Sequence, residues 1–284
     1  MTGFVEIVEV GPRDGLQNEP RPIAVSDKIA LIDLLSQAGF RRIEAASFVS
    51  PKWVPQMAGS AEVMAGLTRH PGVAYAALTP NLQGFQAAMA AGADAVAVFA
   101  AATEEFSRAN LNCSISESLD RFQPVLQAAR VRNVPVRGYV SVVTDCPFQG
   151  AVPPAQVAQV AERLWAAGCH EIALGETLGR GTPDRVAAML AAVRDVVPVE
   201  RLAGHFHDTG GRALDNVDVA LAAGLRVFDA AVGGLGGCPY APGAAGNLAT
   251  ERLAAHLAAR GWQTGLDPAV LDRAAALAHS LRAG

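Results

Sequence analysis

The sequence contains few of the patterns that indicate a structural metal site, a disulfide framework or nucleic-acid binding. Its four cysteines are widely spaced and form no C-x-x-C pair, which argues against a structural zinc site and a disulfide framework. No block of lysine or arginine could follow a phosphate backbone, so we expect no nucleic-acid partner. Such a composition favours a reducing compartment.

Targeting and membrane segments are also missing. The N-terminal stretch MTGFVEIVEV contains neither a basic segment followed by an apolar run nor an arginine-rich leader. The most apolar stretch, residues 87–103, is interrupted by Gly92 and Asp94, which is typical of a helix end and a buried strand rather than a membrane span. We therefore expect a cytoplasmic protein without membrane contact.

Hydrophobic residues are abundant, by contrast, at 51% of 284 residues, and a net charge of −4 arises from interspersed charges of both signs. A short phrase also recurs: AGF at 38–40, AGA at 91–93, AGC at 167–169 and AGL at 223–225. Glycine suits the left-handed position just past a helix end, and the apolar run that follows each phrase is typical of a buried parallel strand. The phrase marks the joint of a repeated helix–strand unit.

Counting these units gives eight strands that alternate with helices. The predicted strands cover residues 4–10, 42–45, 74–78, 95–99, 134–143, 171–174, 201–207 and 226–232. The predicted helices cover residues 26–37, about 60–67, 81–91, 114–131, 154–167, 183–195, 211–223 and 247–260, and a further helix covers about 265–282. This α/β pattern predicts a single catalytic domain, 1–284. We expect a (β/α)8 TIM barrel at about residues 4–260 with a C-terminal helical extension; the alternative is an open doubly wound sheet.

The sharpest chemical signal is the pair His205 and His207 at the end of the seventh predicted strand. Side chains two apart on a strand point to the same face, so both imidazoles would face the barrel interior. Active sites of such barrels lie at the carboxyl ends of the strands. Two histidines and one carboxylate can hold a divalent cation and leave positions open for substrate, and Asp14 is the candidate third ligand. The alternative is a pair of hydrogen-bonded core histidines.

Three further residues stand out near the predicted strand ends. Arg13, beside Asp14, can hold a carboxylate or a developing oxyanion, or form a surface ion pair of little value. Glu44 lies in an apolar strand, where it would orient Arg13 or a metal-bound water, or only close a buried salt bridge. Cys238 lies in the glycine-rich segment VGGLGGCPYAPGAAGN, before a helix start expected near Asn247, and a helix N-terminus lowers the pKa of a thiol. The segment lacks the G-x-x-x-x-G-K-[ST] pattern of a nucleotide P-loop.

Five stretches between residues 6 and 251 carry a family resemblance: EVGPRDGLQNEP, SFVSPKWVPQM, RGYVS, GHFHDT and GGLGGCPYAPGAAGNLATE. They resemble the 3-hydroxy-3-methylglutaryl-CoA (HMG-CoA) lyase family. The R-D-G-x-Q and H-x-H patterns are shared with a wider group of divalent-metal TIM-barrel lyases and synthases. The glycine-rich segment and SFVSPKWVPQM are specific to the lyases.

The resemblance implies a metal-dependent retro-Claisen cleavage of HMG-CoA to acetyl-CoA and acetoacetate, as in leucine degradation. It implies Mg²⁺ or Mn²⁺ held by Asp14, His205, His207 and Asn247. The implied catalytic residues are Arg13, Asp14, Glu44, His205 and Cys238, and the implied supporting residues are Gln17, Asn110, Glu176 and Glu251. An acyl-CoA substrate and a homodimer or larger homo-oligomer are implied as well.

The implied residues suit the chemistry. A cation bound to the C3 hydroxyl lowers the pKa of that hydroxyl, and Asp14 or His205 takes the proton directly or through a water. Arg13 would stabilise the negative charge on the thioester oxygen. Cys238, carried by a loop that closes as a lid, would protonate the enolate carbon, since a thiol with a pKa near 8.5 keeps its proton at neutral pH.

The sequence departs from the family pattern at two places. Glu176 stands where the family usually has aspartate, which moves a carboxylate by about one bond length. Pro20 stands where a basic residue is common, so Lys52 or Arg108 is the candidate for holding the CoA phosphates.

Other functions compete with this one. A related lyase would act on a bulkier 3-hydroxy-3-alkylglutaryl-CoA, for which Ala45, Ala46 and Ala173 leave room. A Claisen-type synthase would lack the glycine-rich segment, and an iron(II) oxygenase would give Cys238 no role. An inactive scaffold barrel would not need the other motif residues, although Glu176 could be a sign of decay.

Overall fold

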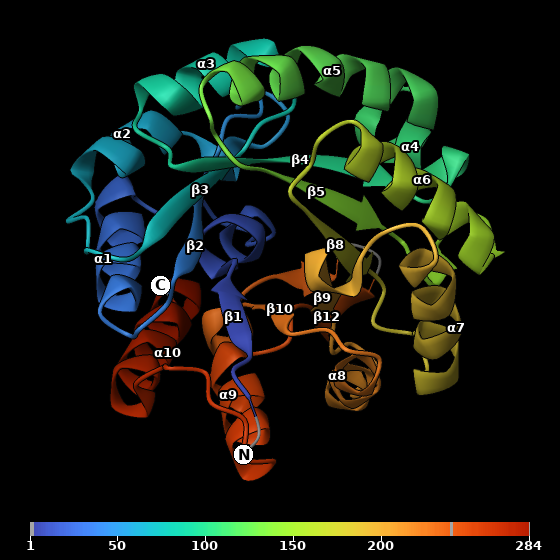
Figure 1. The fold of residues 1–284 in the computed structure, drawn as a ribbon. Helices are drawn as coiled ribbons and strands as arrows, with labels where there is room; N and C mark the ends of the chain where they lie inside the picture. Colours follow the sequence, from blue (N-terminus) through green and yellow to red (C-terminus); the bar gives the residue numbers. More distant parts are fainter. Residues whose placement is uncertain (1–2, 239–240, 284) are drawn as a thin grey trace.

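The chain forms a closed barrel of eight parallel strands (Figure 1). The computed structural model describes residues 3–238 and 241–283, with the side chains at 237–238, 241–245 and 283 outside that description. The strand order is β1-β10-β9-β8-β5-β4-β3-β2. The strands are β1 Glu6–Glu9, β2 Arg42–Ser47, β3 Ala74–Leu78, β4 Ala95–Ala101, β5 Val136–Ser141, β8 Glu171–Glu176, β9 Leu202–Phe206 and β10 Val227–Ala230. The predicted TIM barrel is confirmed.

Helices surround the barrel on its outside (Figure 1). They are α1 Val25–Ser36, α2 Ser60–Gly66, α3 Leu82–Ala90, α5 Ile115–Val131, α6 Pro154–Ala166, α7 Pro183–Arg194, α8 Ala213–Ala222 and α9 Thr250–Ala259. The C-terminal helix α10, Pro268–Ala283, packs against α1 and against the 3-10 turn η4, Val232–Gly234. The last helix therefore touches the loop that follows β10.

Periodicity does not predict one helix and two hairpins. Helix α4, Glu104–Leu111, begins after Thr103, whose hydroxyl accepts a hydrogen bond from the amide of Phe106. Two hairpins project from the loops, namely β6 Asp145–Cys146 with β7 Gly150–Ala151 and β11 Gly237–Cys238 with β12 Ala241–Ala245. Most of their strands have two residues, which is too short for an alternation to be visible.

The recurring glycine phrase has the conformation that its position predicts. Gly39, Gly92, Gly168 and Gly224 all have positive φ, between 81° and 107°. At Gly39 a side chain is excluded a second time, because a Cβ atom would lie 2.3 Å from the carbonyl oxygen of Gly265. Gly39, between α1 and β2, therefore packs closely against the segment that precedes α10.

Helix α9 begins three residues later than the sequence predicts, at Thr250 rather than at 247. The intervening residues are held extended, because the amide of Asp208 donates to the carbonyl of Gly246 and that of Leu248 to Phe206. Cys238 is the last residue of β11, and strand β12 lies between it and the helix. The expectation that Cys238 immediately precedes a helix N-terminus is therefore wrong.

Alternation along the strands separates two cores. Outward side chains such as Val96 and Val98 of β4 join the large apolar layer beneath the helices. Inward side chains such as Ala97 of β4 and Tyr139 of β5 form a smaller cluster inside the barrel. The small inner residues leave space in the barrel for charged groups.

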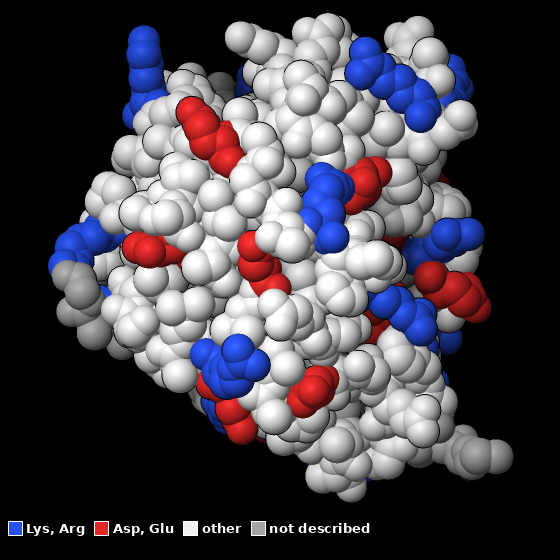
Figure 2. Space-filling view, turned by 90° about the vertical axis from the view of Figure 1, so that its left-hand side faces the viewer, with Lys and Arg blue, Asp and Glu red and all other residues white. Residues whose placement is uncertain are grey.

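Charges on the outer surface are dispersed. Figure 2 shows one face, on which Lys and Arg side chains lie scattered among Asp and Glu on a largely uncharged surface. Among the described residues, no helix has both the length and the apolar character needed to cross a bilayer.

Candidate metal and catalytic site

The two histidines lie at the carboxyl end of β9 on its inner face. Ala203, two residues before His205, belongs to the cluster inside the barrel, whereas Phe206 belongs to the outer core. The Nε2 atoms of His205 and His207 are 3.3 Å apart, and both residues are buried. They share one face of the strand, as the H-x-H spacing predicts.

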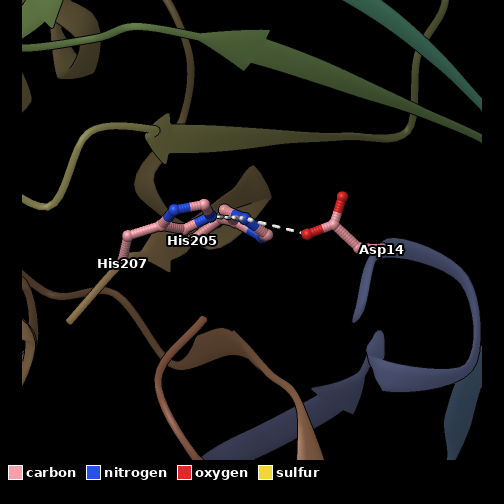
Figure 3. A group of neighbouring side chains, drawn as sticks. All are labelled: Asp14, His205 and His207. Atoms are coloured by element: carbon pink, nitrogen blue, oxygen red, sulfur yellow. Dashed lines mark hydrogen bonds and ion pairs between the residues drawn. The ribbon is translucent and has the colours of Figure 1, made fainter. Parts of the chain in front are cut away.

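Asp14 approaches the histidines from the turn that follows β1 (Figure 3). Its Oδ2 atom lies 3.8 Å from Nε2 of His205. One ligand atom from each of Asp14, His205 and His207 lies within 4.8 Å of the other two. These three residues, from the first and last thirds of the chain, thus converge on one point.

The turn that carries Asp14 is a single π-helical turn, Gly11–Gly15, in which the amides of Asp14 and Gly15 both donate to the carbonyl of Val10. A Cβ atom at Gly15 would lie 2.6 Å from Cβ of Leu235. Glycine is therefore required here by the close approach of the loop after β10. This packing places the R-D-G segment against the glycine-rich segment.

Asn247, the fourth residue implied as a ligand, lies beside Asp14. Its Nδ2 atom donates to Oδ2 of Asp14 at 2.9 Å and to the carbonyl of Leu235 at 3.2 Å. An antiparallel backbone bridge also joins Asn247 to His207. The fold therefore brings the fourth side chain to the same cluster.

The neutral imidazole of His207 and the ionised carboxyl of Asp14 suit a divalent cation. Burial and the neighbouring His205 lower the pKa of His207 to about 4, so its imidazole is neutral at pH 7. Burial raises the pKa of Asp14, but Arg13 and the histidines outweigh burial and keep the carboxyl ionised. Burial lowers the pKa of His205, but its hydrogen bond to Asp229 and the charge of Asp14 raise it overall. Imidazole and carboxylate donors in this arrangement fit a divalent cation such as Mg²⁺ or Mn²⁺.

Arg13 is held between two carboxylates. Its Nη1 atom donates to Oδ1 of Asp14 at 2.6 Å, and its Nε atom donates to Oε2 of Glu44 at 2.7 Å. Arg13 and Glu44 are both buried, so the ion pair is shielded from solvent. Glu44 both closes a buried salt bridge and orients Arg13, and among the described residues its Oε1 atom has no hydrogen-bond partner.

Three further residues of this site, all on barrel strands, were not predicted from the sequence. Tyr139 donates its hydroxyl to Glu44, Arg137 donates to that hydroxyl, and Asp229 accepts from His205 Nδ1 at 3.0 Å. Arg137 and Asp229 are buried charges in apolar strands. The rule that singled out Glu44, that a buried charge needs a partner, would have found them too.

The two supporting glutamates hold loops rather than contacting the cluster directly. Glu176, at the end of β8, accepts from the Thr144 hydroxyl at 3.1 Å and from the amide of Arg180 at 3.2 Å, and burial raises its pKa. Glu251, in the first turn of α9, accepts from the amide of Gly233 at 3.0 Å.

The remaining predicted residues lie nearer the surface. Gln17 is half-buried in the short helical stretch that continues the π-helical turn, and Asn110 is exposed on α4. Lys52 and Arg108, the candidates for the CoA phosphates, are also exposed. The side chain of Cys238 lies outside the described part of the chain, and only its backbone is placed, in β11.

Comparison with known proteins decides the family. The family model described as HMGL-like matches residues 4–277. The chain belongs to the HMGL-like family. Among relatives of this HMGL-like chain, the 3-hydroxy-3-isohexenylglutaryl-CoA/hydroxy-methylglutaryl-CoA lyase of Pseudomonas aeruginosa is 59% identical over 263 residues, covering 93% of this chain and 88% of that protein. The hydroxymethylglutaryl-CoA lyase of Pseudomonas mevalonii is 57% identical, with 93% and 87% covered.

A solved structure extends the similarity to the whole HMGL-like fold. The crystal structure of the HMG-CoA lyase from Brucella melitensis is 57% identical and superimposes with a TM-score of 0.99. The match covers 100% of both chains. The barrel, the added hairpins and the C-terminal helix thus belong to an arrangement already found in an HMG-CoA lyase.

Proposed function

We propose that this HMGL-like chain is a carbon–carbon lyase that cleaves HMG-CoA to acetyl-CoA and acetoacetate. The observation that carries the proposal is the cluster of Asp14, His205 and His207 beside the buried Arg13. The names of the relatives and of the Brucella structure support the same reaction. The reaction breaks the C2–C3 bond, converts the C3 hydroxyl to a ketone and leaves the electron pair on C2 of acetyl-CoA.

The residues that would hold a divalent cation are Asp14, His205, His207 and Asn247. When bound, Mg²⁺ or Mn²⁺ would lower the pKa of the C3 hydroxyl and fix its orientation. Asp14 would take the hydroxyl proton, directly or through a water, because Nε2 of His205 would hold the cation and its Nδ1 donates to Asp229. Asn247, which contacts Asp14, keeps that carboxylate oriented.

Arg13 would stabilise the charge that develops on the thioester oxygen. Asp14 and Glu44 hold its guanidinium on two sides, so the positive charge is in place before the reaction. A preorganised charge in a buried site loses little energy to reorganisation, and it stabilises an oxyanion more strongly than water does. Glu44 therefore acts through Arg13.

Cys238 would supply the proton for C2 of the enolate. The proposal is supported by the match of its segment to the lyase pattern and by the position of β11, which follows η4 next to the turn that carries Arg13 and Asp14. An ordinary thiol is protonated at neutral pH, which is the state that an acid needs.

A coupled assay for acetoacetate tests the proposal. The purified protein with Mg²⁺ or Mn²⁺ should release acetoacetate from HMG-CoA, and EDTA should abolish this. Cys238→Ala should lower turnover by orders of magnitude while Mn²⁺ binding stays unchanged. Full activity of Cys238→Ala would refute its role as the acid, and no acetoacetate with any divalent metal would refute the function.

A second candidate is a lyase for a bulkier C3 substituent. The observation that favours it is the name of the relative from Pseudomonas aeruginosa, which includes the 3-hydroxy-3-isohexenyl substrate. The same catalytic residues would serve both substrates. Both substrates release acetyl-CoA, whereas only HMG-CoA gives acetoacetate, so the two are compared by acetyl-CoA release. A higher kcat/KM for the isohexenyl compound than for HMG-CoA would assign the chain to the bulkier class. A cytoplasmic location and a homodimer or larger assembly stay predictions.

A further inference from the structure

A closed ring of interacting side chains passes through the barrel next to the proposed metal ligands. We call it the charge ring, and it consists of Asp14, Arg13, Glu44, Tyr139, Arg137, Asp229 and His205. Its members come from the turn after β1 and from β2, β5, β10 and β9. The ring therefore links five parts of the barrel to one site.

The half of the charge ring that contains Asp229 and Arg137 was not predicted from the sequence. Oδ2 of Asp229 accepts from Nδ1 of His205 at 3.0 Å, and Oδ1 lies 2.8 Å from Nη2 of Arg137. The side chain of Asp229 is fully buried. An ionised carboxylate in such a place is stable only if its charge is paired, and Arg137 supplies the paired charge.

We propose that Asp229, held by Arg137, is a positioning residue that presents Nε2 of His205 to the divalent cation. The inference rests on the proposed function, because it assigns a role within that metal site. A carboxylate only accepts hydrogen bonds, so the proton of the neutral imidazole must lie on Nδ1. The lone pair then lies on Nε2, the atom that faces His207 and Asp14.

Arg137 cannot easily move away from Asp229, since three of its nitrogen atoms serve three partners. Nε donates to Glu171 at 2.7 Å, Nη1 donates to the Tyr139 hydroxyl at 2.9 Å, and Nη2 pairs with Asp229. The ring of Tyr139 also meets the imidazole of His205 edge-on, with centroids 6.1 Å apart. Both the tautomer and the ring plane of His205 are therefore held.

Asp229→Asn is the decisive substitution. Arg137 can only donate, so the new amide turns its oxygen to Arg137 and its NH₂ group to Nδ1 of His205. The imidazole proton must then move to Nε2, which can no longer bind a cation. We expect the dissociation constant for Mn²⁺, measured by electron paramagnetic resonance of free Mn²⁺, to rise roughly 10- to 100-fold.

Asp218→Asn is the matched control. Oδ1 of Asp218, on α8, is hydrogen-bonded to Nε2 of His256 at 2.8 Å, so the same change is made in an aspartate–histidine pair outside the site. Mn²⁺ affinity should stay at the wild-type value in this variant. A melting temperature measured for each protein without metal separates loss of affinity from loss of fold.

The outcomes distinguish the inference from the proposed function. If Asp229→Asn folds and binds Mn²⁺ as tightly as the wild type, the positioning role is refuted and the function stands. If the wild-type protein itself neither binds Mn²⁺ nor cleaves HMG-CoA, the proposed function fails instead.

A measurement on the wild-type protein covers the case in which Asp229→Asn does not fold. The chain has six histidines, so selective ¹⁵N labelling gives a tractable spectrum. At pH 9 without metal, the signal that disappears in His205→Gln should show the proton on Nδ1. A proton on Nε2 of His205 would overturn the inference.

Discussion

At the scale of single residues, buried carboxylates connect the loops of this site. Glu9, at the end of β1, is fully buried and accepts from the amides of Gly11 and Val232 and from the Thr250 hydroxyl. It therefore links the turn that carries Arg13, the loop after β10 and the start of α9. Burial raises the pKa of Glu9 to about 7, although these hydrogen bonds oppose the rise.

The raised pKa of Glu9 predicts a pH-dependent stability. Because its folded pKa lies above the unfolded value of 4.5, its contribution is fully present below about pH 4.5 and is lost as the pH rises through about 7. Glu9→Gln mimics the protonated acid and escapes this loss. The difference in the free energy of unfolding, Glu9→Gln minus wild type, should therefore increase by roughly 2–3 kcal/mol between pH 5 and pH 8.

Urea denaturation across that pH range measures the effect of Glu9→Gln. Glu200→Gln, at an exposed position, is the control and should show no such trend. A stability difference between Glu9→Gln and wild type that is constant from pH 5 to pH 8 would contradict the prediction.

At the scale of elements, the C-terminal helix α10 contributes to the site through one arginine. Nε of Arg282 donates to Oε1 of Glu19 at 2.8 Å, and its Nη2 donates to the carbonyl of Gly234 at 2.8 Å. The same Glu19 oxygen accepts from the amide of Gly236. Helix α10 thus holds the start of the segment that carries Cys238.

Arg282→Gln should loosen that segment without unfolding the barrel. The arginine is about one-third exposed, so we expect a loss of about 1 kcal/mol in local stability. The amide of Gly236 should then exchange with solvent roughly fivefold faster, as measured by hydrogen exchange. Arg273→Gln, on an exposed face of α10, is the control. Equal exchange at Gly236 in all three proteins would show that Arg282 does not hold the segment.

At the scale of the whole molecule, the site exists only when the barrel is closed. Strand β1 pairs with β10 on one side and with β2 on the other. This closure brings Asp14 from the first turn to His205 and Asn247 from the last third of the chain. A cation held by all of them would bind the folded state and not the unfolded chain.

Mn²⁺ should therefore stabilise the whole protein. At a free concentration one hundred times the dissociation constant, the gain is about 2.7 kcal/mol, which raises the melting temperature by several degrees. Differential scanning calorimetry with and without Mn²⁺ measures it. The rise should persist in Asp218→Asn and vanish in His207→Ala. A melting temperature that does not respond to Mn²⁺ in the wild type would argue against the metal site.

Much of the fold and part of the site could be predicted from local patterns. The glycines at four helix ends could be predicted because only a short stretch of chain decides their left-handed conformation. They are Gly39, Gly92, Gly168 and Gly224. The same-face placement of His205 and His207 follows from the strand period alone. The hairpins were missed because strands of mostly two residues show no alternation, and helix α4 was missed because its eight residues span little more than two turns.

The sequence by itself determined eight helix–strand units, the inward pair of histidines and the residue types of the family. Only the tertiary structure decided which buried charges meet. The pairing of Arg137 with Asp229, the neutral state of His207 and the reach of Arg282 to Gly234 all depend on strands and helices far apart in the chain. Periodicity and turn chemistry act over a few residues, whereas the partner of a buried charge depends on which distant strands the closed barrel brings together.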